Sequence, residues 1–409
     1  MSQSEPTAQA AVSPDTRPPR VSDRLRPFGT TIFAEMTALA NEHGAVNLSQ
    51  GFPDDPGPEL AHDAAARAMR AGHNQYAPMP GSPDLRRAIA GWCQRGIGIE
   101  PHPDREVTVT GGATGALAAT MIGLINPGDE VVLFEPFYDS YRADVAMAGG
   151  VPRFVTLRPH GGRFTFDPSQ LRNAFGPKTR AVLVNTPHNP TGTVFSGAEL
   201  AQIAEQCVKH DAVAVSDEVY ERLTYDPAQP HVSIASLPGM WERSVVISSI
   251  GKTFSLTGWK IGWAVAPAHL TAGIRAAHQF LAYSVPTPLQ HGAAVMLDLG
   301  EDHIRRIVAH DHAMLEKLRP ALEDLGFGVF DPAGTYFIMA DHRAVSERVG
   351  VLGDVEFCRW LTAEAKVAAI PPSAFYETGG GGSEYVRFAF CKRAETIDEA
   401  VRRLRAALA

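Results

Sequence analysis

The chain has 409 residues, more than one hydrophobic core usually supports, so its length predicts two domains. Its apolar fraction of 44% and charged fraction of 20% are ordinary for a globular protein. The net charge of −8 argues against a basic surface for nucleic acid or anionic membrane, and no stretch approaches the roughly 20 apolar residues of a membrane span.

Residues 1–20 are rich in Ser, Pro, Ala and Gln, and this composition predicts a disordered tail. The tail lacks the basic start and apolar centre of a signal peptide. The cysteines are far apart and form no CxxC pair, which indicates neither a disulfide framework nor a zinc site: Cys93, Cys207, Cys358 and Cys391. We therefore expect a cytoplasmic protein with reduced thiols.

From about residue 105 to 265, short apolar segments alternate with segments of helical pattern. The apolar segments are continuous, as in strands that helices cover on both faces. We expect such strands at residues 107–110, 131–134, 181–184, 212–215 and 245–247. The alternation predicts an α/β fold with a central, mostly parallel sheet flanked by helices.

Beyond about residue 300 the pattern changes. A charged amphipathic stretch at 301–325 precedes a strand candidate at 334–339, a helical stretch at 354–365 and a further strand at 385–390. This mixture predicts a smaller α+β domain. We expect an N-terminal arm at 21–60 that belongs partly to the small domain, a large domain at 61–295 and a small C-terminal domain at 296–409.

Polar clusters directly follow several of the predicted strands. They occupy residues 111–114, 185–192, 217–220 and 248–252. In open α/β sheets the ligand crevice lies outside the carboxyl ends of the strands. The sequence therefore predicts that these clusters share one site.

Lys252 lies among small and hydroxylated residues just after the apolar stretch 245–247. Burial there would disfavour the ammonium and lower its pKa, leaving an amine able to form a Schiff base with an aldehyde. Two other motifs fail at this position. A P-loop would need a glycine at Val246, and the SxxK pattern that starts at Ser249 lacks its Lys-Thr-Gly and Ser-Asp-Asn partners.

Three of the polar stretches, in this order and spacing, resemble the signatures of class I and II aminotransferases, which have fold type I and depend on pyridoxal phosphate. They are Asn-Thr-Pro-His-Asn-Pro-Thr-Gly at 185–192, Asp-Glu-Val-Tyr at 217–220 and Ser-Ile-Gly-Lys at 249–252. The likeness covers nearly the whole chain from about Arg24. Residues 47–54, 74–76 and 135–138 further resemble the kynurenine and methionine branch and bacterial succinyldiaminopimelate aminotransferases.

The resemblance implies a role for each strand-end residue. Lys252 would hold pyridoxal 5′-phosphate and move the proton between the substrate α-carbon and the C4′ atom. Asp217 would pair with the pyridinium nitrogen, while Asn189 and Tyr220 would hydrogen-bond the phenolic oxygen. Taken singly, these three residues would also be ordinary as a helix cap, a turn residue and a core aromatic, respectively.

The cofactor phosphate needs oriented donors and positive charge. Ala113 and Thr114 begin a predicted helix after paired glycines, where free N–H groups and the helix dipole favour an anion. The resemblance assigns the phosphate to this helix start, with a hydroxyl from Ser249 and a charge from Lys260. A single cation such as Lys260 is also common on a protein surface.

Two aromatic residues complete the predicted cofactor site. Phe137 would stack on the ring, although it could equally belong to the core. Tyr76 would reach the phosphate of the neighbouring subunit, which implies a homodimer with shared active sites.

Arg387 lies in an apolar and aromatic strand, where an unpaired guanidinium is costly and should meet an anion. The α-carboxylate of an amino acid suits its planar fork. A structural salt bridge is the alternative. The resemblance adds Gly51 as a close backbone contact of the same carboxylate.

These expectations describe an aminotransferase that works by a ping-pong cycle between an L-amino acid and a 2-oxo acid. A β-lyase acting on cysteine S-conjugates would use the same residues and remains the alternative. A transcriptional regulator with an aminotransferase-like module would need a DNA-binding domain, for which about twenty N-terminal residues leave little room. Methionine, aromatic amino acids, kynurenine, glutamine and N-succinyl-LL-2,6-diaminopimelate stay open as donors, and Tyr283 is a candidate for selecting among them.

Overall fold

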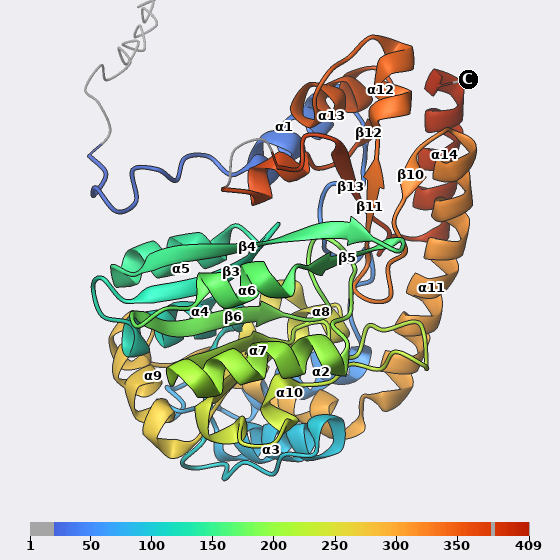
Figure 1. Ribbon diagram of the computed structural model, residues 1–409. Coiled ribbons are helices and arrows are strands. Elements are labelled where there is room, and N and C mark those ends of the chain that lie inside the picture. Colours follow the sequence, from blue (N-terminus) through green and yellow to red (C-terminus); the bar gives the residue numbers. More distant parts are fainter. Residues whose placement is uncertain (1–19, 378–380, 409) are drawn as a thin grey trace, which may run out of the picture.

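The computed structural model describes residues 20–377 and 381–408 (Figure 1). The predicted tail at 1–20 therefore lies, except for Arg20, outside the described residues. The helices are α1 (Ile32–His43), α2 (Glu59–Arg70), α3 (Pro83–Ile97), α4 (Gly112–Leu124), α5 (Ser140–Ala148), α6 (Pro168–Ala174), α7 (Gly197–His210), α8 (Ile250–Thr253), α9 (Ala268–Leu281), α10 (Thr287–Leu299), α11 (Glu301–Asp324), α12 (Arg343–Val349), α13 (Asp354–Ala363) and α14 (Ala394–Leu408).

The strands form one large and two small sheets. The large sheet has the order β2-β9-β8-β7-β6-β3-β4-β5. Its strands are β2 (Val107–Gly111), β3 (Glu130–Glu135), β4 (Val151–His160), β5 (Arg163–Phe166), β6 (Thr179–Asn185), β7 (Val213–Asp217), β8 (Ser244–Ser249) and β9 (Ile261–Val265). The small sheets use β1 (Val46–Asn47), β10 (Gly328–Val329), β11 (Phe337–Asp341), β12 (Val367–Ala368) and β13 (Tyr385–Ala389).

The prediction of a mostly parallel central sheet is confirmed. The strands β4, β3, β6, β7 and β8 run parallel to one another, while β9 is antiparallel to both β8 and β2. The strand β9 was not predicted, nor was the antiparallel hairpin of β4 and β5 at the other edge. The hairpin lies at the edge of the sheet, whereas β9 lies between β8 and β2, two strands whose ends carry polar clusters.

Helices cover the large sheet on both faces, which explains the continuous apolar strands (Figure 1). Alternate residues of each strand enter different cores. Val131 and Leu133 pack with residues of α4, α5 and α9, whereas Val132 and Phe134 pack with residues of α6 and α7. A third core joins α3 and α10 to β2 and β9. The strands of the large sheet are therefore buried between packed helices.

The C-terminal elements form a further core with the start of the chain. The strand β1 pairs in parallel with β12, and α1 lies beside α13 in the upper part of Figure 1. The antiparallel sheet β10-β11-β13 carries the long helix α11, which runs from this region down the side of the large sheet. The strand expected at 334–339 begins only at Phe337, because Thr335 has a φ of 64° and cannot continue an extended chain. The domain boundaries remain a prediction.

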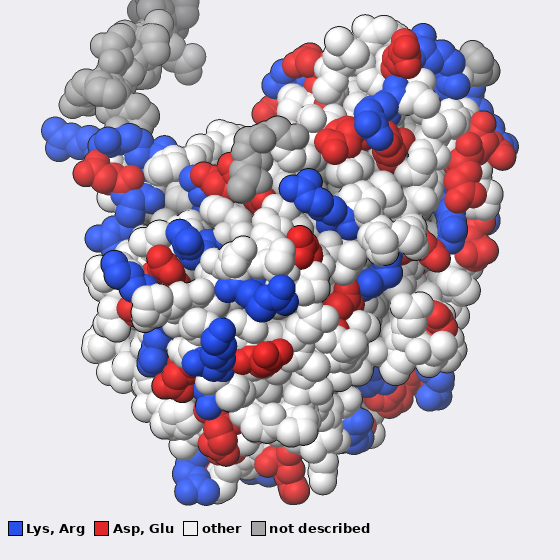
Figure 2. Space-filling view, viewed as in Figure 1, with Lys and Arg blue, Asp and Glu red and all other residues white. Residues whose placement is uncertain are grey.

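On the face in Figure 2, acidic and basic side chains are interspersed rather than gathered by sign. Ion pairs such as Lys317–Asp398, between α11 and α14, and Arg319–Asp331, between α11 and the segment after β10, join neighbouring surface charges. Over residues 20–377 and 381–408, no helix has both the length and the apolar composition to cross a bilayer.

Candidate active site

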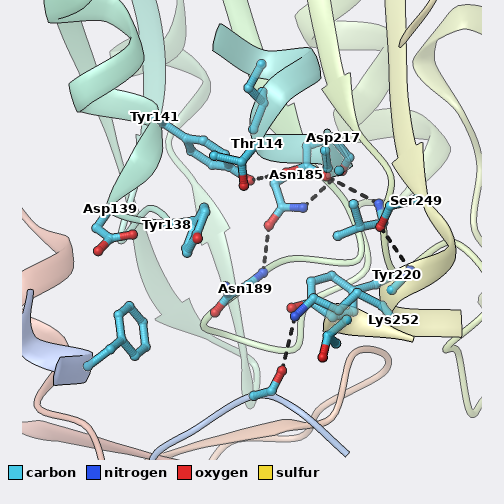
Figure 3. Close-up of a pocket in the computed structure, with 18 of the residues that line it drawn as sticks. Thr114, Tyr138, Asp139, Tyr141, Asn185, Asn189, Asp217, Tyr220, Ser249 and Lys252 are labelled. Carbon is cyan, nitrogen blue, oxygen red and sulfur yellow. Dashed lines mark hydrogen bonds between the residues drawn. The ribbon is translucent and has the colours of Figure 1, made fainter. Parts of the chain in front are cut away.

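A cavity of about 440 Å³ lies at the carboxyl ends of the parallel strands (Figure 3). Its wall combines the ends of β6, β7 and β8, the start of α4, and residues from the N-terminal and C-terminal segments. The structure brings most of the predicted site residues together in this wall: Gly51, Ala113, Thr114, Asn189, Asp217, Tyr220, Ser249, Lys252, Lys260 and Arg387.

Lys252 lies in the single turn α8, directly after β8. The Ser249 hydroxyl accepts a hydrogen bond from the backbone of Gly251 and so begins this turn. The Lys252 Nζ atom donates to the Gly51 carbonyl at 3.1 Å and stands 5.9 Å from the centre of the Tyr220 ring. Burial lowers the pKa of Lys252 to about 8, so a neutral amine is accessible near neutral pH.

Asp217 is the last residue of β7 and is 4% exposed. Its carboxylate accepts hydrogen bonds from the Tyr141 hydroxyl at 2.7 Å and from the backbone N–H of Val219 at 3.3 Å (Figure 3). Burial raises its pKa to about 6, although these two hydrogen bonds and the charge of Lys252 oppose the rise. The carboxylate is therefore ionised at neutral pH but carries an uncompensated cost that a cationic ligand would relieve.

The start of α4 forms a second polar end of the cavity. Gly112 has a φ of 71°, and no side chain caps the helix. A Cβ atom on Gly112 would stand 3.2 Å from the Lys260 Nζ atom, so the ammonium lies directly beside the first turn. Backbone N–H groups, a helix dipole and a lysine together make an anion site.

Arg387, in the middle of β13, is 1% exposed. Its Nη1 atom donates to Asn189 Oδ1 at 2.9 Å, its Nη2 atom donates to the Ser49 carbonyl at 2.8 Å, and the Phe337 ring centre lies 4.0 Å from its Cζ atom. Among the residues that the structure describes, no carboxylate forms an ion pair with this guanidinium, and its Nε atom has no partner. The salt-bridge alternative is therefore not observed. Burial lowers the pKa of Arg387 to about 10.

Asn185 and Gly51 connect the site residues through hydrogen bonds. The Asn185 side chain donates to the Asp217 carbonyl at 2.9 Å and accepts from the Asn189 backbone at 2.8 Å. The Gly51 carbonyl accepts from the Tyr336 hydroxyl at 2.7 Å as well as from Lys252. A Cβ atom on Gly51 would stand 2.5 Å from the Phe337 ring, so only glycine fits this approach.

The expectation for Phe137 remains a prediction. Its side chain packs in the core, where its ring lies 5.8 Å from that of Phe154 at an angle of 21°, and it is not part of the described cavity wall. The neighbouring Tyr138 lines the cavity instead (Figure 3). Consecutive side chains of an extended segment point to opposite sides, so a shift of one residue exchanges a core position for a site position.

Tyr76 also lies outside the cavity wall. It is 84% exposed, and its ring contacts that of Tyr283 edge-on at 5.7 Å. Its expected contact with a neighbouring subunit remains a prediction.

The sequence interpretation missed several residues of the wall. Tyr138 and Asp139 lie between β3 and α5, and Tyr141 lies in the first turn of α5; of these, only Tyr138 falls in the stretch 135–138 that carried the family resemblance. Asn185 lies inside a predicted signature stretch but received no role. Gln50 donates to the Phe33 carbonyl and joins the arm to the site, a contact that no local pattern reveals.

The cavity fits pyridoxal phosphate on the evidence of its own donors. It holds an amine of lowered pKa at Lys252, a buried carboxylate at Asp217 and an uncapped helix start beside Lys260. These match the aldehyde, the ring nitrogen and the phosphate of that cofactor. The guanidinium of Arg387 is left for an anion of a second molecule.

Comparisons with known proteins agree with this chemistry. The model of the family described as aminotransferase class I and II matches residues 44–404. A probable N-succinyldiaminopimelate aminotransferase DapC of Mycobacterium tuberculosis is 49% identical over 389 residues, which cover 93% of this chain and 97% of the relative. A methionine aminotransferase of Escherichia coli is 42% identical with the same coverage. The structure of N-succinyldiaminopimelate aminotransferase from M. tuberculosis superposes with a TM-score of 0.92 at 48% identity over 95% of this chain and 100% of that chain.

Proposed function

The chain belongs to the aminotransferase class I and II family and is a transaminase, and on that premise we propose that it moves the amino group of an L-amino acid to a 2-oxo acid in a ping-pong cycle with pyridoxal 5′-phosphate. One observation carries the proposal. The same cavity holds the Lys252 amine, the Asp217 carboxylate and the Arg387 guanidinium without a carboxylate partner in the described chain.

When bound, pyridoxal phosphate supplies an aldehyde for an amine and a ring that withdraws electrons from the substrate α-carbon. Asp217 would hold a proton at the ring nitrogen, since an adjacent positive charge would relieve the buried carboxylate. Asn189 and Tyr220 would donate to the phenolic oxygen. Phe137 and Tyr138, which follow β3, would cover the ring face, and of the two Tyr138 lines the cavity.

The start of α4 would hold the phosphate, with Ala113 and Thr114 supplying backbone N–H groups. Ser249 adds a hydroxyl and Lys260 a positive charge. Tyr76 of a second copy adds a further donor, so the working form is a homodimer. We place this enzyme in the cytoplasm.

Lys252 acts on the substrate as an acid and a base. Its amine would hold the cofactor and, when free, would move the proton at the substrate α-carbon. A pKa of about 8 suits both tasks, because the neutral and charged forms are then both populated at physiological pH. Arg387 holds the α-carboxylate through its planar fork, with Gly51 close by, and fixes the α-carbon within reach of this amine.

The donors open to it are methionine, kynurenine and N-succinyldiaminopimelate, which the names of relatives include, and aromatic amino acids, after which the aminotransferase of one similar structure is named; for the third donor we propose the LL-2,6 form. The cavity adds apolar and aromatic walls from Phe33, Tyr138 and Phe337, which suit a side chain longer than that of alanine.

The test is to load the purified protein with pyridoxal phosphate, reduce it with borohydride and map the modified peptide by mass. We expect the label on Lys252 and the loss of label and turnover in Lys252→Ala. The exposed Lys178 offers a matched control, because Lys178→Ala should retain both. Label on another lysine, or turnover in Lys252→Ala, contradicts the proposal. Release of pyruvate and ammonia from a cysteine conjugate without a 2-oxo acid would identify the β-lyase alternative.

A further inference from the structure

A buried ion pair adjoins the cofactor residue Asp217 and has no part in the proposed function. Glu218, the next residue in the chain, is 1% exposed and is not part of the described cavity wall. Its Oε2 atom lies 2.9 Å from the Nε2 atom of His231, whose side chain is also buried. Burial disfavours the imidazolium of His231, but the charge and the hydrogen bond of Glu218 outweigh that cost and raise its pKa. A protonated His231 is therefore favoured beside the Glu218 carboxylate.

Ser216 and Glu218 flank Asp217 in the chain, and their side chains are hydrogen-bonded to each other. The Ser216 hydroxyl donates to Glu218 Oε1 at 2.7 Å, and the Ser233 hydroxyl donates to the same atom at 2.6 Å. The Glu218 N–H donates to the Ile247 carbonyl of β8 at 2.8 Å. Alternate residues of an extended segment point to opposite sides, so the bond between Ser216 and Glu218 on one side directs Asp217 to the other side, into the cavity (Figure 3).

Glu221 is a second carboxylate of the same buried region, but it has different partners. It accepts hydrogen bonds from the Trp92 indole N–H at 2.9 Å and from the Ser248 hydroxyl at 2.8 Å. Burial raises the pKa of Glu221 to about 7, although these hydrogen bonds oppose the rise. Neither partner adjoins Asp217 in the chain, so Glu221 offers a matched comparison for Glu218.

A buried ion pair seldom adds more stability than well-packed apolar side chains would, so the clearest consequence of this pair is the direction that it gives the chain. We propose that Glu218, with His231 as its counter-ion, is a positioning residue: it fixes the backbone at Asp217 so that the Asp217 carboxylate meets the ring nitrogen of pyridoxal phosphate. This inference rests on the proposed function, which assigns Asp217 to that nitrogen. Glu218 also acts by its charge, because burial is the main cause of the raised pKa of Asp217 and the charge of Glu218 adds to the rise.

The sharpest probe is the carbon analogue of pyridoxal phosphate in which a C–H group replaces the ring nitrogen. It keeps the aldehyde, the phenolic oxygen and the phosphate but offers no partner to Asp217. We would titrate the cofactor-free full chain with both compounds at pH 8 and compare the dissociation constants in wild type, Glu218→Gln and the matched control Glu221→Gln. We expect wild type and the control to prefer pyridoxal phosphate by about tenfold or more, as for a charge-assisted hydrogen bond. Glu218→Gln should reduce that preference to about threefold or less, with its affinity for the carbon analogue little changed.

A second variant, Ser216→Ala, removes a single hydroxyl and does not depend on how Glu218→Gln folds. It keeps the charges of Glu218 and His231, and it should lower the same preference by about two- to threefold. An unchanged preference in either variant, an equal loss of affinity for both compounds, or the same loss of preference in Glu221→Gln would each overturn the role of Glu218. A wild type that binds both compounds equally well would instead refute the assignment of Asp217 in the proposed function itself.

Discussion

The hydrogen bond from Tyr141 to Asp217 gives a quantitative test of the site's electrostatics. Its 2.7 Å length and buried surroundings mark a charge-assisted bond, worth about 1.5–3 kcal/mol when Asp217 is ionised. Tyr141→Phe removes the hydroxyl and keeps the ring. Since one pKa unit corresponds to about 1.4 kcal/mol, the pKa of Asp217 should rise by about one to two units above its present value.

The sign follows from linkage. In the wild type the pKa of Asp217 is raised by burial from 3.8 to about 6, so the unfolded chain releases this proton first and the stability of the fold decreases as pH rises through that window. The ionised carboxylate then costs about 3 kcal/mol at pH 8. In Tyr141→Phe the decrease continues to higher pH. The loss of unfolding free energy caused by Tyr141→Phe should be about 2 kcal/mol larger at pH 8.5 than at pH 5, where Asp217 is protonated in both folded proteins.

The assay is urea unfolding of the cofactor-free protein at both pH values. Tyr138→Phe is the control, because Tyr138 lines the same cavity without a hydrogen bond to Asp217 and should show no such pH dependence. When Tyr141→Phe is introduced into Asp217→Asn, its effect on the unfolding free energy should be the same at both pH values, because the ionisable carboxylate is gone. A Tyr141→Phe effect of equal size at pH 5 and pH 8.5 would refute the reasoning, since it would reflect packing rather than the charge of Asp217.

Three other substitutions test separate parts of the site. Lys260→Ala should weaken pyridoxal phosphate binding about tenfold but leave the binding of phosphate-free pyridoxal unchanged, which cofactor titration would show. Arg387→Lys should lower kcat/KM about a hundredfold at unchanged cofactor affinity, because a lysine cannot make the two-pronged contact, and steady-state kinetics measure this. Gly262→Ala places a Cβ atom 2.4 Å from the Gly112 carbonyl carbon and should cost about 1–3 kcal/mol in thermal unfolding, whereas Gly258→Ala, with nothing within 4 Å, should change stability by less than about 0.5 kcal/mol.

Much of the large sheet could be predicted because buried parallel strands leave a plain signal in the sequence. Continuous apolar runs of four residues, such as 131–134 and 181–184, are typical of buried strands when helical segments separate them. The strand β9 has a similar run, but Gly262 interrupts it, and its antiparallel direction depends on a chain reversal after Lys260 that composition does not encode. Pairing across long sequence distances, such as β1 with β12, is likewise decided only by packing.

The site could be predicted where chemistry demands a particular residue type. An amine, a carboxylate and a guanidinium in apolar surroundings are costly unless they act, so Lys252, Asp217 and Arg387 stood out from the sequence. Aromatic residues carry no such signal. Phe137 and Tyr138 are adjacent and similar, and which of them faces the cavity depends on a backbone direction fixed by the Phe137 N–H bond to Phe375, a residue far away in the chain.

Each end of the cavity contains one buried charged residue whose ionised form is disfavoured by burial. Asp217 and Arg387 both remain charged in a place that disfavours charge, and the lowered pKa of Arg387, from 12.5 to about 10, corresponds to about 3 kcal/mol against its ionised form. The Asn189 side chain and the Ser49 carbonyl hold the guanidinium in position without neutralising it, because an amide and a backbone carbonyl supply only partial charge. A cationic cofactor ring beside Asp217 and a substrate carboxylate beside Arg387 would together recover both costs. The buried charges of Asp217 and Arg387 therefore lower the stability of the fold. The same free energy favours binding of groups whose opposite charges lie beside these two residues.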